Sequence, residues 1–330
     1  MAKFMNTLLR TLKTIILPII VYLAFSILSK NRFGQPAGML TIARQSIMPI
    51  MVALAITCNM TIGMWDFSAG AVVYTAAIVG GNLALMTGTG IPGLIVILIL
   101  IAVTLNTITG LLYNLFKVPS IVLTIGLMMV YEMIPTLLFK GGVLISGKMT
   151  HLALPPYCFI VFAVMFIIFY VVFNYTPFGH NVRALGSNQA IAANVGLNPA
   201  TIKLVSFIFG GVFLGMAAVM DLSTKGMIRP PATMGSVSMI FDAMMGIFIA
   251  FFLQKYCNLA IGVVVGTFTM KMLNSGLVSM GLSTTVRDIT TGLFLLILLC
   301  ISANQGKFTE WRNNKEKARL ANEKFTQANA

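Results

Sequence analysis

The sequence predicts an all-α integral membrane protein, a polytopic bundle of about ten transmembrane helices. Only 9% of its 330 residues are charged, against about 25% in soluble domains. Hydrophobic residues make up 58%, and the mean hydropathy is +0.93. Apolar runs of about 20 residues recur along the chain, long enough to cross about 30 Å of hydrocarbon. A soluble fold would need surface groups that this sequence lacks.

The first apolar run follows Lys3, Arg10 and Lys13 and resembles a signal peptide. Its only small-x-small pattern, Ala24-Phe25-Ser26, lies inside the run, so we expect a retained first span. Pro49 and Pro135 fall within later runs and are expected to kink them. In order, the expected spans are about 14–29, 46–62, 69–88, 92–115, 119–138, 157–175, 202–222, 237–253, 258–276 and 286–303.

The gaps between the spans carry most of the charge, which is +14 overall. An even number of spans puts both termini on one side, where 13 Lys and Arg would lie against 8 on the other. Positive residues favour the cytoplasmic side. We therefore expect both termini in the cytoplasm, a transmembrane domain over 1–306 and a basic cytoplasmic tail over 307–330.

Several kinds of chemistry are excluded by missing motifs. The sequence has no G-x-x-x-x-G-K-[ST] phosphate loop, so ATP hydrolysis by this chain is not expected. Its four cysteines contain no C-x-x-C pair, which argues against a disulfide framework or a zinc site. No basic face interleaved with aromatic residues indicates nucleic-acid binding. We expect a protein that is not an enzyme and binds no metal.

Polar residues inside apolar runs are the candidates for a translocation path. Asp66 and Ser68 suit a helix N-cap, alone or combined with a place in the path. Asn106, Gly110 and Asn114 share one helix face, which must meet another helix or a water-filled path. The complete set of path candidates is Asn59, Asp66, Ser68, Asn82, Asn106, Asn114, Glu132 and Asn274.

The remaining charged groups near the spans are assigned differently. Asp221, Asp242 and Asp288 lie near expected span ends, where water can reach them, so structural roles are favoured for all three. Glu132 and Lys271 are the only charged groups expected deep in the membrane. Four-residue spacing of small residues, at 211 and 215 and at 262 and 266, predicts closely packed helices.

A polar stretch, Arg183–Lys203, separates two very apolar runs. The preceding residues 177–180 are expected to stop a span, and 188–195 can form a short helix ended by Gly196. Asn198 can cap the next helix, with Pro199 at its first position. Such an ordered polar segment on the cytoplasmic side implies a partner.

Four stretches resemble the permease (transmembrane) subunit of bacterial ABC importers, in the ribose/monosaccharide-type branch. They are "DFSAGA" at 66–71, "VPSIVLTIG" at 118–126, "RALGSNQAIAANVGLN" at 183–198 and "FIFGGVFLGMAAVM" at 207–220. The resemblance implies that the third stretch docks an ATPase. The residues that carry this coupling would be Arg183, Gly186, Ser187, Asn188, Gln189, Ala192, Ala193 and Gly196.

The resemblance also implies partners and a location. We expect an ABC ATPase subunit that holds ATP and Mg, an extracytoplasmic substrate-binding protein, a second permease chain and the lipid of a bacterial plasma membrane. No cofactor is expected on this chain. A Gly-rich motif usual in the family is missing at 246–262, which favours pairing with a more typical permease, although both homodimer and heterodimer stay open.

Other functions remain as alternatives. The solute could be a nucleoside or a branched-chain amino acid, as in other members of the same superfamily. A stand-alone secondary carrier or an integral-membrane enzyme would need clustered ionisable or catalytic residues. The sequence shows no such cluster.

Overall fold

A computed structural model of the protein describes residues 2–29, 33–283, 285–286, 289–294, 296–297 and 300. The chain forms two compact units, Met1–Ser279 and Met280–Ala330. In the second unit, residues 289–294 are helical. Much of the expected tenth span and all of the expected tail lie outside the described residues, so both stay predictions.

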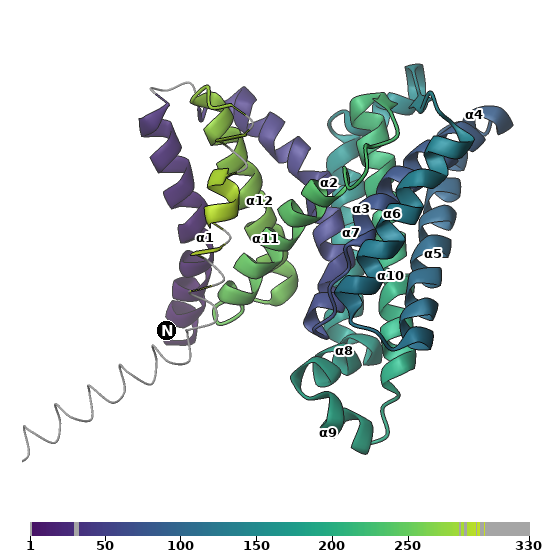
Figure 1. Ribbon diagram of the computed structural model, residues 1–330. Helices are drawn as coiled ribbons and strands as arrows, with labels where there is room; N and C mark the ends of the chain where they lie inside the picture. The colour runs from purple at the N-terminus through teal and green to yellow at the C-terminus, as the bar shows by residue number, and fades with distance from the viewer. Residues whose placement is uncertain are drawn as a thin grey trace, which may run out of the picture. The chain divides into compact units, whose positions relative to one another are not determined.

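The first unit consists almost entirely of helices (Figure 1). Long helices alternate with short connections, as the spacing of the apolar runs predicts. The helices are α1 Ala2–Leu28, α2 Pro36–Thr61, α3 Ser68–Thr75, the π-helix η1 Ala76–Gly80, α4 Gly81–Thr87, α5 Gly90–Phe116, α6 Ser120–Leu138, the 3₁₀-helix η2 Gly147–Ala153, α7 Tyr157–Tyr175, α8 Pro177–Ser187, α9 Gln189–Asn194, α10 Pro199–Lys225, α11 Val237–Leu253 and α12 Leu259–Ser279.

Seven helices in the described part of the chain are long and apolar enough to cross a membrane. They are α2, the continuous α3–η1–α4 helix, α5, α6, α7, α10 and α12. Two shorter apolar helices, Thr14–Leu28 and Val237–Leu253, fall where further spans are expected. The all-α polytopic membrane fold is therefore confirmed, while the number ten is not.

Glycines let the central helices approach until their backbones touch. A Cβ at Gly211 would lie 2.7 Å from the Cα of Val103, and one at Gly215 would lie 2.5 Å from the Cα of Ile99. These contacts join α10 to α5. Gly266 likewise meets the backbone of Gly246, which joins α12 to α11. The close packing predicted from the four-residue spacing is confirmed.

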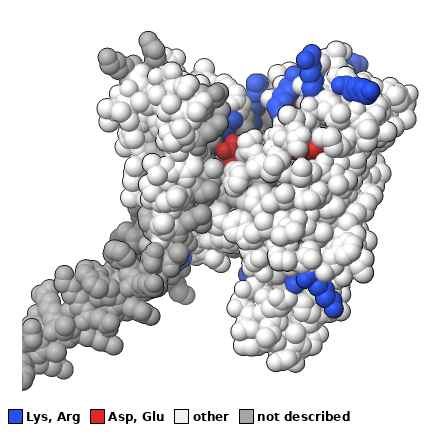
Figure 2. All heavy atoms as spheres, viewed as in Figure 1, with Lys and Arg blue, Asp and Glu red and all other residues white. Residues whose placement is uncertain are grey.

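The two ends of this helical unit differ. At one end, β1 (Val143–Leu144) pairs antiparallel with β2 (Met227–Ile228), with Val143 opposite Ile228. At the other end lie α8 and α9 (Figure 1). On the face shown in Figure 2, the described basic side chains gather at these two ends, and the band between them is mostly uncharged. Such a band suits the hydrocarbon of a bilayer.

Candidate functional site: a polar knob and a polar cavity

The helices α8 and α9 form a polar knob between α7 and α10. The expected stop of the preceding span is confirmed, because α7 ends at Tyr175 and Thr176 is extended. What was not expected is a new helix from there, since Pro177 occupies the first position of α8. Proline fits this position, since its missing N–H would have no partner in the first helical turn. Arg183, Gly186 and Ser187 therefore lie in α8 and not in a loop.

Two asparagines cap helices in this segment, Asn188 at the start of α9 and Asn198 at the start of α10. The Asn188 Oδ1 accepts hydrogen bonds from the backbone N–H groups of Ala190 and Ile191, each at 3.0 Å. Gly196, just after α9, has φ +89°, a left-handed conformation that glycine adopts without strain. The Asn198 Oδ1 caps α10 in the same way. The short helix, its glycine stop and the second cap are confirmed.

The knob is attached firmly to the bundle. A Cβ at Gly186 would collide with the backbone carbonyl oxygen of Thr61, at the end of α2. The Arg183 guanidinium lies 5.3 Å from the ring centroid of Phe173, within the range of a cation–π interaction. Ala192 is buried. A force applied to α9 would therefore reach α2 and α7 through α8.

The outer surface of the knob carries two unpartnered apolar side chains. Ile191 is 62% exposed and Val195 is 75% exposed. Their neighbours Gln189, Ala193 and Gly196 are also exposed. Exposed apolar groups with a polar rim are typical of a protein interface.

The asparagine stripe on α5 faces another helix. The Asn106 Nδ2 donates to the Phe207 carbonyl oxygen at 2.6 Å, and the Asn114 Nδ2 donates to the Ala200 carbonyl oxygen at 2.9 Å. Both acceptors belong to α10. The stripe was expected to meet either another helix or a water-filled path. In the structure it packs against α10.

Two other path candidates hold chain segments in place. Glu132, fully buried, accepts from the backbone N–H of Met234 at 2.7 Å and that of Ser236 at 2.8 Å, just before α11. The Asn82 Nδ2 donates to the carbonyl oxygens of Ile78 and Gly142. Neither of these side chains lies in a described cavity.

The α2–α3 junction buries three more candidates. The Asp66 Oδ1 accepts from the backbone N–H of Ser68 at 3.1 Å and from its hydroxyl at 2.6 Å, which is a capping role at the start of α3. The other carboxylate oxygen of Asp66 and both amide atoms of Asn59 have no hydrogen-bond partner. A small polar molecule such as water would satisfy them.

The path candidates therefore do not come together as one group. Asn274 is the member that lies beside a larger cavity, where its Nδ2 is 3.5 Å from the Asp242 Oδ1. Both residues line a small void of about 10 Å³ with Lys271 and Thr267. Asp242 and Lys271 also line the larger cavity.

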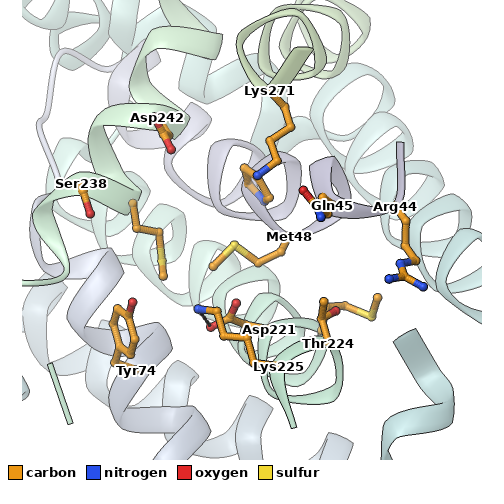
Figure 3. Close-up of a pocket in the computed structure, with 13 residues that line it drawn as sticks. Arg44, Gln45, Met48, Tyr74, Asp221, Thr224, Lys225, Ser238, Asp242 and Lys271 are labelled. Carbon is orange, nitrogen blue, oxygen red and sulfur yellow. Dashed lines mark hydrogen bonds and ion pairs between the residues drawn. The ribbon is translucent and has the colours of Figure 1, made fainter. Parts of the chain in front are cut away.

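This cavity, of about 410 Å³, lies among α2, α3, α10, α11 and α12. Its charged lining residues are Arg44, Asp221, Lys225, Asp242 and Lys271. In Figure 3, Lys271 and Asp242 lie on one side of the view and the Asp221–Lys225 pair on the other, with Met48 between them. The lining also includes Gln45, Tyr74, Thr224 and Ser238.

An ion pair organises one wall of the cavity. The Lys225 Nζ lies 2.8 Å from the Asp221 Oδ2 and 5.6 Å from the ring centroid of Tyr74. The Asp221 side chain is 8% exposed, while that of Lys225 is 46% exposed. The carboxylate is thus held inside the wall and the ammonium group reaches toward the opening.

Sequence reasoning missed most of this cavity. Asp221 and Asp242 are assigned structural roles because they lie near span ends, yet both line it. Lys271, a charge within an expected span, is the one signal that could have pointed there. In the described part of the chain, no group of three or more His, Cys, Asp or Glu could hold a metal ion.

A multi-span helical bundle with an ordered polar knob at one end and a polar cavity within it defines a membrane transport protein. The chain belongs to the family described as "branched-chain amino acid transport system / permease component", whose model matches residues 38–302. It is similar to the Autoinducer 2 import system permease protein LsrC of Photorhabdus luminescens, with 26% identity over 76% of this chain and 77% of the relative.

Two further relatives are equally similar. The LsrC protein of Yersinia pseudotuberculosis serotype O:1b (strain IP 31758) is 26% identical over 84% of this chain and 80% of its own length. The Ribose import permease protein RbsC of Bacillus subtilis is 26% identical over 86% of this chain and 89% of its own length. No solved structure matches the chain.

Proposed function

We propose that this protein is the permease subunit of an ATP-driven importer for a monosaccharide or a similar small polar solute. The relatives are named as import permeases for ribose and for autoinducer 2. The permease role follows from the family, and the solutes named for the relatives favour a sugar over a nucleoside or a branched-chain amino acid.

One observation carries the ATP-driven mechanism: the ordered polar knob exposes two large apolar side chains on its outer surface. Ile191 and Val195 point away from the bundle, and leaving them exposed to water is unfavourable by about 25 cal/mol per Å² of apolar surface. A docked ATPase would cover them and would hold the ATP and Mg. Its closure would push the knob against the end of α2 at Thr61.

The chain order supports the orientation. Six apolar helices precede α8: α1, α2, α3–η1–α4, α5, α6 and α7. If each crosses the membrane once, the knob lies on the same side as the N-terminus. The excess of Lys and Arg on that side favours the cytoplasm, in a bacterial plasma membrane. A substrate-binding protein would deliver solute to the opposite side, and a second permease chain would complete the transporter.

Co-purification of the ATPase with variants of the knob tests this proposal. Val195→Asp puts a charge into the proposed interface, while Leu144→Asp makes the same change at a similarly exposed site, 65%, on β1 at the opposite end. Loss of an apolar anchor costs about 2 kcal/mol, equal to about a 30-fold loss of affinity. We expect Val195→Asp to lose the ATPase and transport. Leu144→Asp should keep the ATPase, whatever it does to solute delivery on its own side.

The readout is the ATPase recovered per tagged permease from native membranes, beside uptake of D-ribose and other labelled monosaccharides. Equal ATPase recovery and equal uptake for the two variants would contradict the docking role. Val195→Ser provides the same comparison with a smaller change if the aspartate variant fails to accumulate.

A further inference from the structure

We propose that Asn174, near the end of α7, is a positioning residue that carries the movement of the knob to α12. Arg183 of the knob, Asn174 and Asn258 are joined by hydrogen bonds, and these three residues are called the asparagine link. The inference rests on the proposed function, in which an ATPase docks on the knob. It adds a second route, beside α10, from the knob into the bundle.

One oxygen atom joins three elements at the knob end of the bundle. The Asn174 Oδ1 accepts a hydrogen bond from the Asn258 Nδ2 at 2.7 Å and another from the Arg183 Nη1 at 3.4 Å. Asn258 directly precedes α12, and Arg183 lies in α8. The end of α7, the knob and the start of α12 therefore meet at the Asn174 side chain.

The orientation of the Asn174 amide is fixed by its other end. The Asn174 Nδ2 donates to the Tyr170 carbonyl oxygen at 2.9 Å. An amide turned over would place its oxygen against that carbonyl oxygen and its NH₂ group against the Arg183 guanidinium, which has no acceptor. Only one orientation satisfies all the neighbours, so Asn174 offers an acceptor to Arg183 and Asn258 and cannot become a donor to them.

The asparagine link acts on the backbone of α12 and not on a side chain alone. The Asn258 Oδ1 accepts from the backbone N–H of Ala260 at 3.0 Å, which is the role of a helix N-cap. Asn258 thus presents its acceptor to α12 and its donor to Asn174. Since α12 packs mainly against α1, α2 and α11 and far less against α7, this hydrogen bond connects two helices that share little other contact.

The helix α12 forms part of the cavity that α10 also lines. Figure 3 shows Lys271 and Asp242 on one side of the cavity and the Asp221–Lys225 pair on the other. Asp221 and Lys225 belong to α10, which follows the knob, whereas Lys271 belongs to α12. A movement passed only through α10 would displace one wall. The asparagine link would let the same docking event displace the opposite wall, because hydrogen-bond networks between rigid elements can carry such coupling.

Asn258→Asp breaks the asparagine link and keeps the cap of α12. Aspartate is as good an N-cap as asparagine, but an ionised carboxylate has no hydrogen to donate to the Asn174 Oδ1. Gln254→Glu is the matched control, because it also converts an amide into a carboxylate in the connection between α11 and α12. Gln254 is exposed and is not part of the asparagine link.

A second pair of variants changes Asn174 itself. Asn174→Leu removes the acceptor at nearly constant size. Asn174→Asp keeps an acceptor for both Asn258 and Arg183 and loses only the donation to Tyr170. We expect the aspartate variant to behave like the unsubstituted protein and the leucine variant to behave like Asn258→Asp.

The measured quantity is the amount of sugar taken up per ATP hydrolysed by the complete transporter in liposomes. Labelled D-ribose, D-xylose and D-glucose are tried, and the sugar that the unsubstituted complex transports is used. Asn258→Asp and Asn174→Leu should retain the ATPase but take up about fivefold less sugar per ATP, which is equivalent to the loss of one hydrogen bond of about 1 kcal/mol. Gln254→Glu and Asn174→Asp should keep the ratio.

This ratio separates transmission from a merely structural role. A structural role would lower the amount of folded transporter, so that uptake and ATP hydrolysis fall in the same proportion. An unchanged ratio for Asn258→Asp and Asn174→Leu would overturn the proposal and leave the proposed function standing, and so would failure of both variants to accumulate. Recovery of the unsubstituted permease without an ATPase, or sugar uptake that needs no ATP, would instead refute the proposed function.

Discussion

Replacing Gly215 by alanine tests how closely α10 packs against α5. The new Cβ would lie 2.5 Å from the Cα of Ile99 and 3.1 Å from its backbone nitrogen. Carbon atoms in favourable contact are about 3.5–4.0 Å apart. Because the obstructing atoms belong to the backbone of α5, a side-chain rotation cannot remove the clash, and the two helices must separate.

Two opposing effects decide the size of the change. Alanine is better than glycine inside a helix by about 1 kcal/mol. Overpacking a well-packed core costs about 1–3 kcal/mol, and a clash with backbone belongs at the upper end of that range. The free energy of unfolding of Gly215→Ala should therefore fall by about 2 kcal/mol.

Gly126 provides the matched control. It lies inside α6, and no heavy atom lies within 4 Å of a Cβ built there. Gly126→Ala therefore keeps the gain in helix propensity without the clash, and should raise the free energy of unfolding by up to about 1 kcal/mol. The two variants should differ by about 3 kcal/mol.

Denaturant unfolding of the detergent-solubilised permease, with thermal unfolding as a second probe, would measure this difference. Both variants should insert into the membrane, because insertion depends on the hydropathy of each span and not on the packing between spans. Equal stability of the Gly215 and Gly126 variants would refute the reasoning, since α5 and α10 would then have room for a methyl group between their backbones.

Three more predictions follow from individual contacts. Glu132→Ala should lower the thermal stability more than Glu132→Gln does, because alanine leaves two backbone N–H groups before α11 without an acceptor. Each unpaired buried N–H costs about 1–3 kcal/mol of stability, whereas glutamine keeps one acceptor oxygen. Gly186→Val should displace α8 from Thr61, so that the permease accumulates in membranes but co-purifies with less ATPase than Ser187→Val. A reporter that is active only outside the cytoplasm should stay silent when fused after Ala330, whereas strong activity would reverse the orientation.

Hydropathy alone predicted most of the fold, because the length of a span is dictated by the thickness of the hydrocarbon. Each expected span from 14–29 to 258–276 overlaps an apolar helix of the structure. What it could not predict was α8. Proline at 177 follows the end of α7 at Tyr175 and also occupies the first position of α8. The sequence pattern indicated the end of the span, but not that a second helix begins directly after the single extended residue Thr176.

The cavity was harder to predict than the spans. A periodic pattern shows which face of a helix is polar, but it does not show which helix that face meets. The stripe with Asn106 and Asn114 proved to face α10. Conversely, Arg44 and Lys271 are far apart in the sequence, and each is a single charge without a pattern around it. Only the packing of α2 beside α10 and α12 places them at one cavity.

A single helix links the two ends of the proposed mechanism. The first turn of α10 follows the knob, capped by Asn198, and its last turns supply Asp221 and Lys225 to the cavity. Between them, Gly211 and Gly215 pack α10 against the backbone of α5. We therefore expect α10 to move as one element. Because the two backbones touch, docking of the ATPase would change the cavity through α10 only if α5 and α10 moved together. A Gly215→Ala variant that still binds its ATPase and its sugar, but no longer couples ATP hydrolysis to uptake, would identify this contact as the element that transmits the movement.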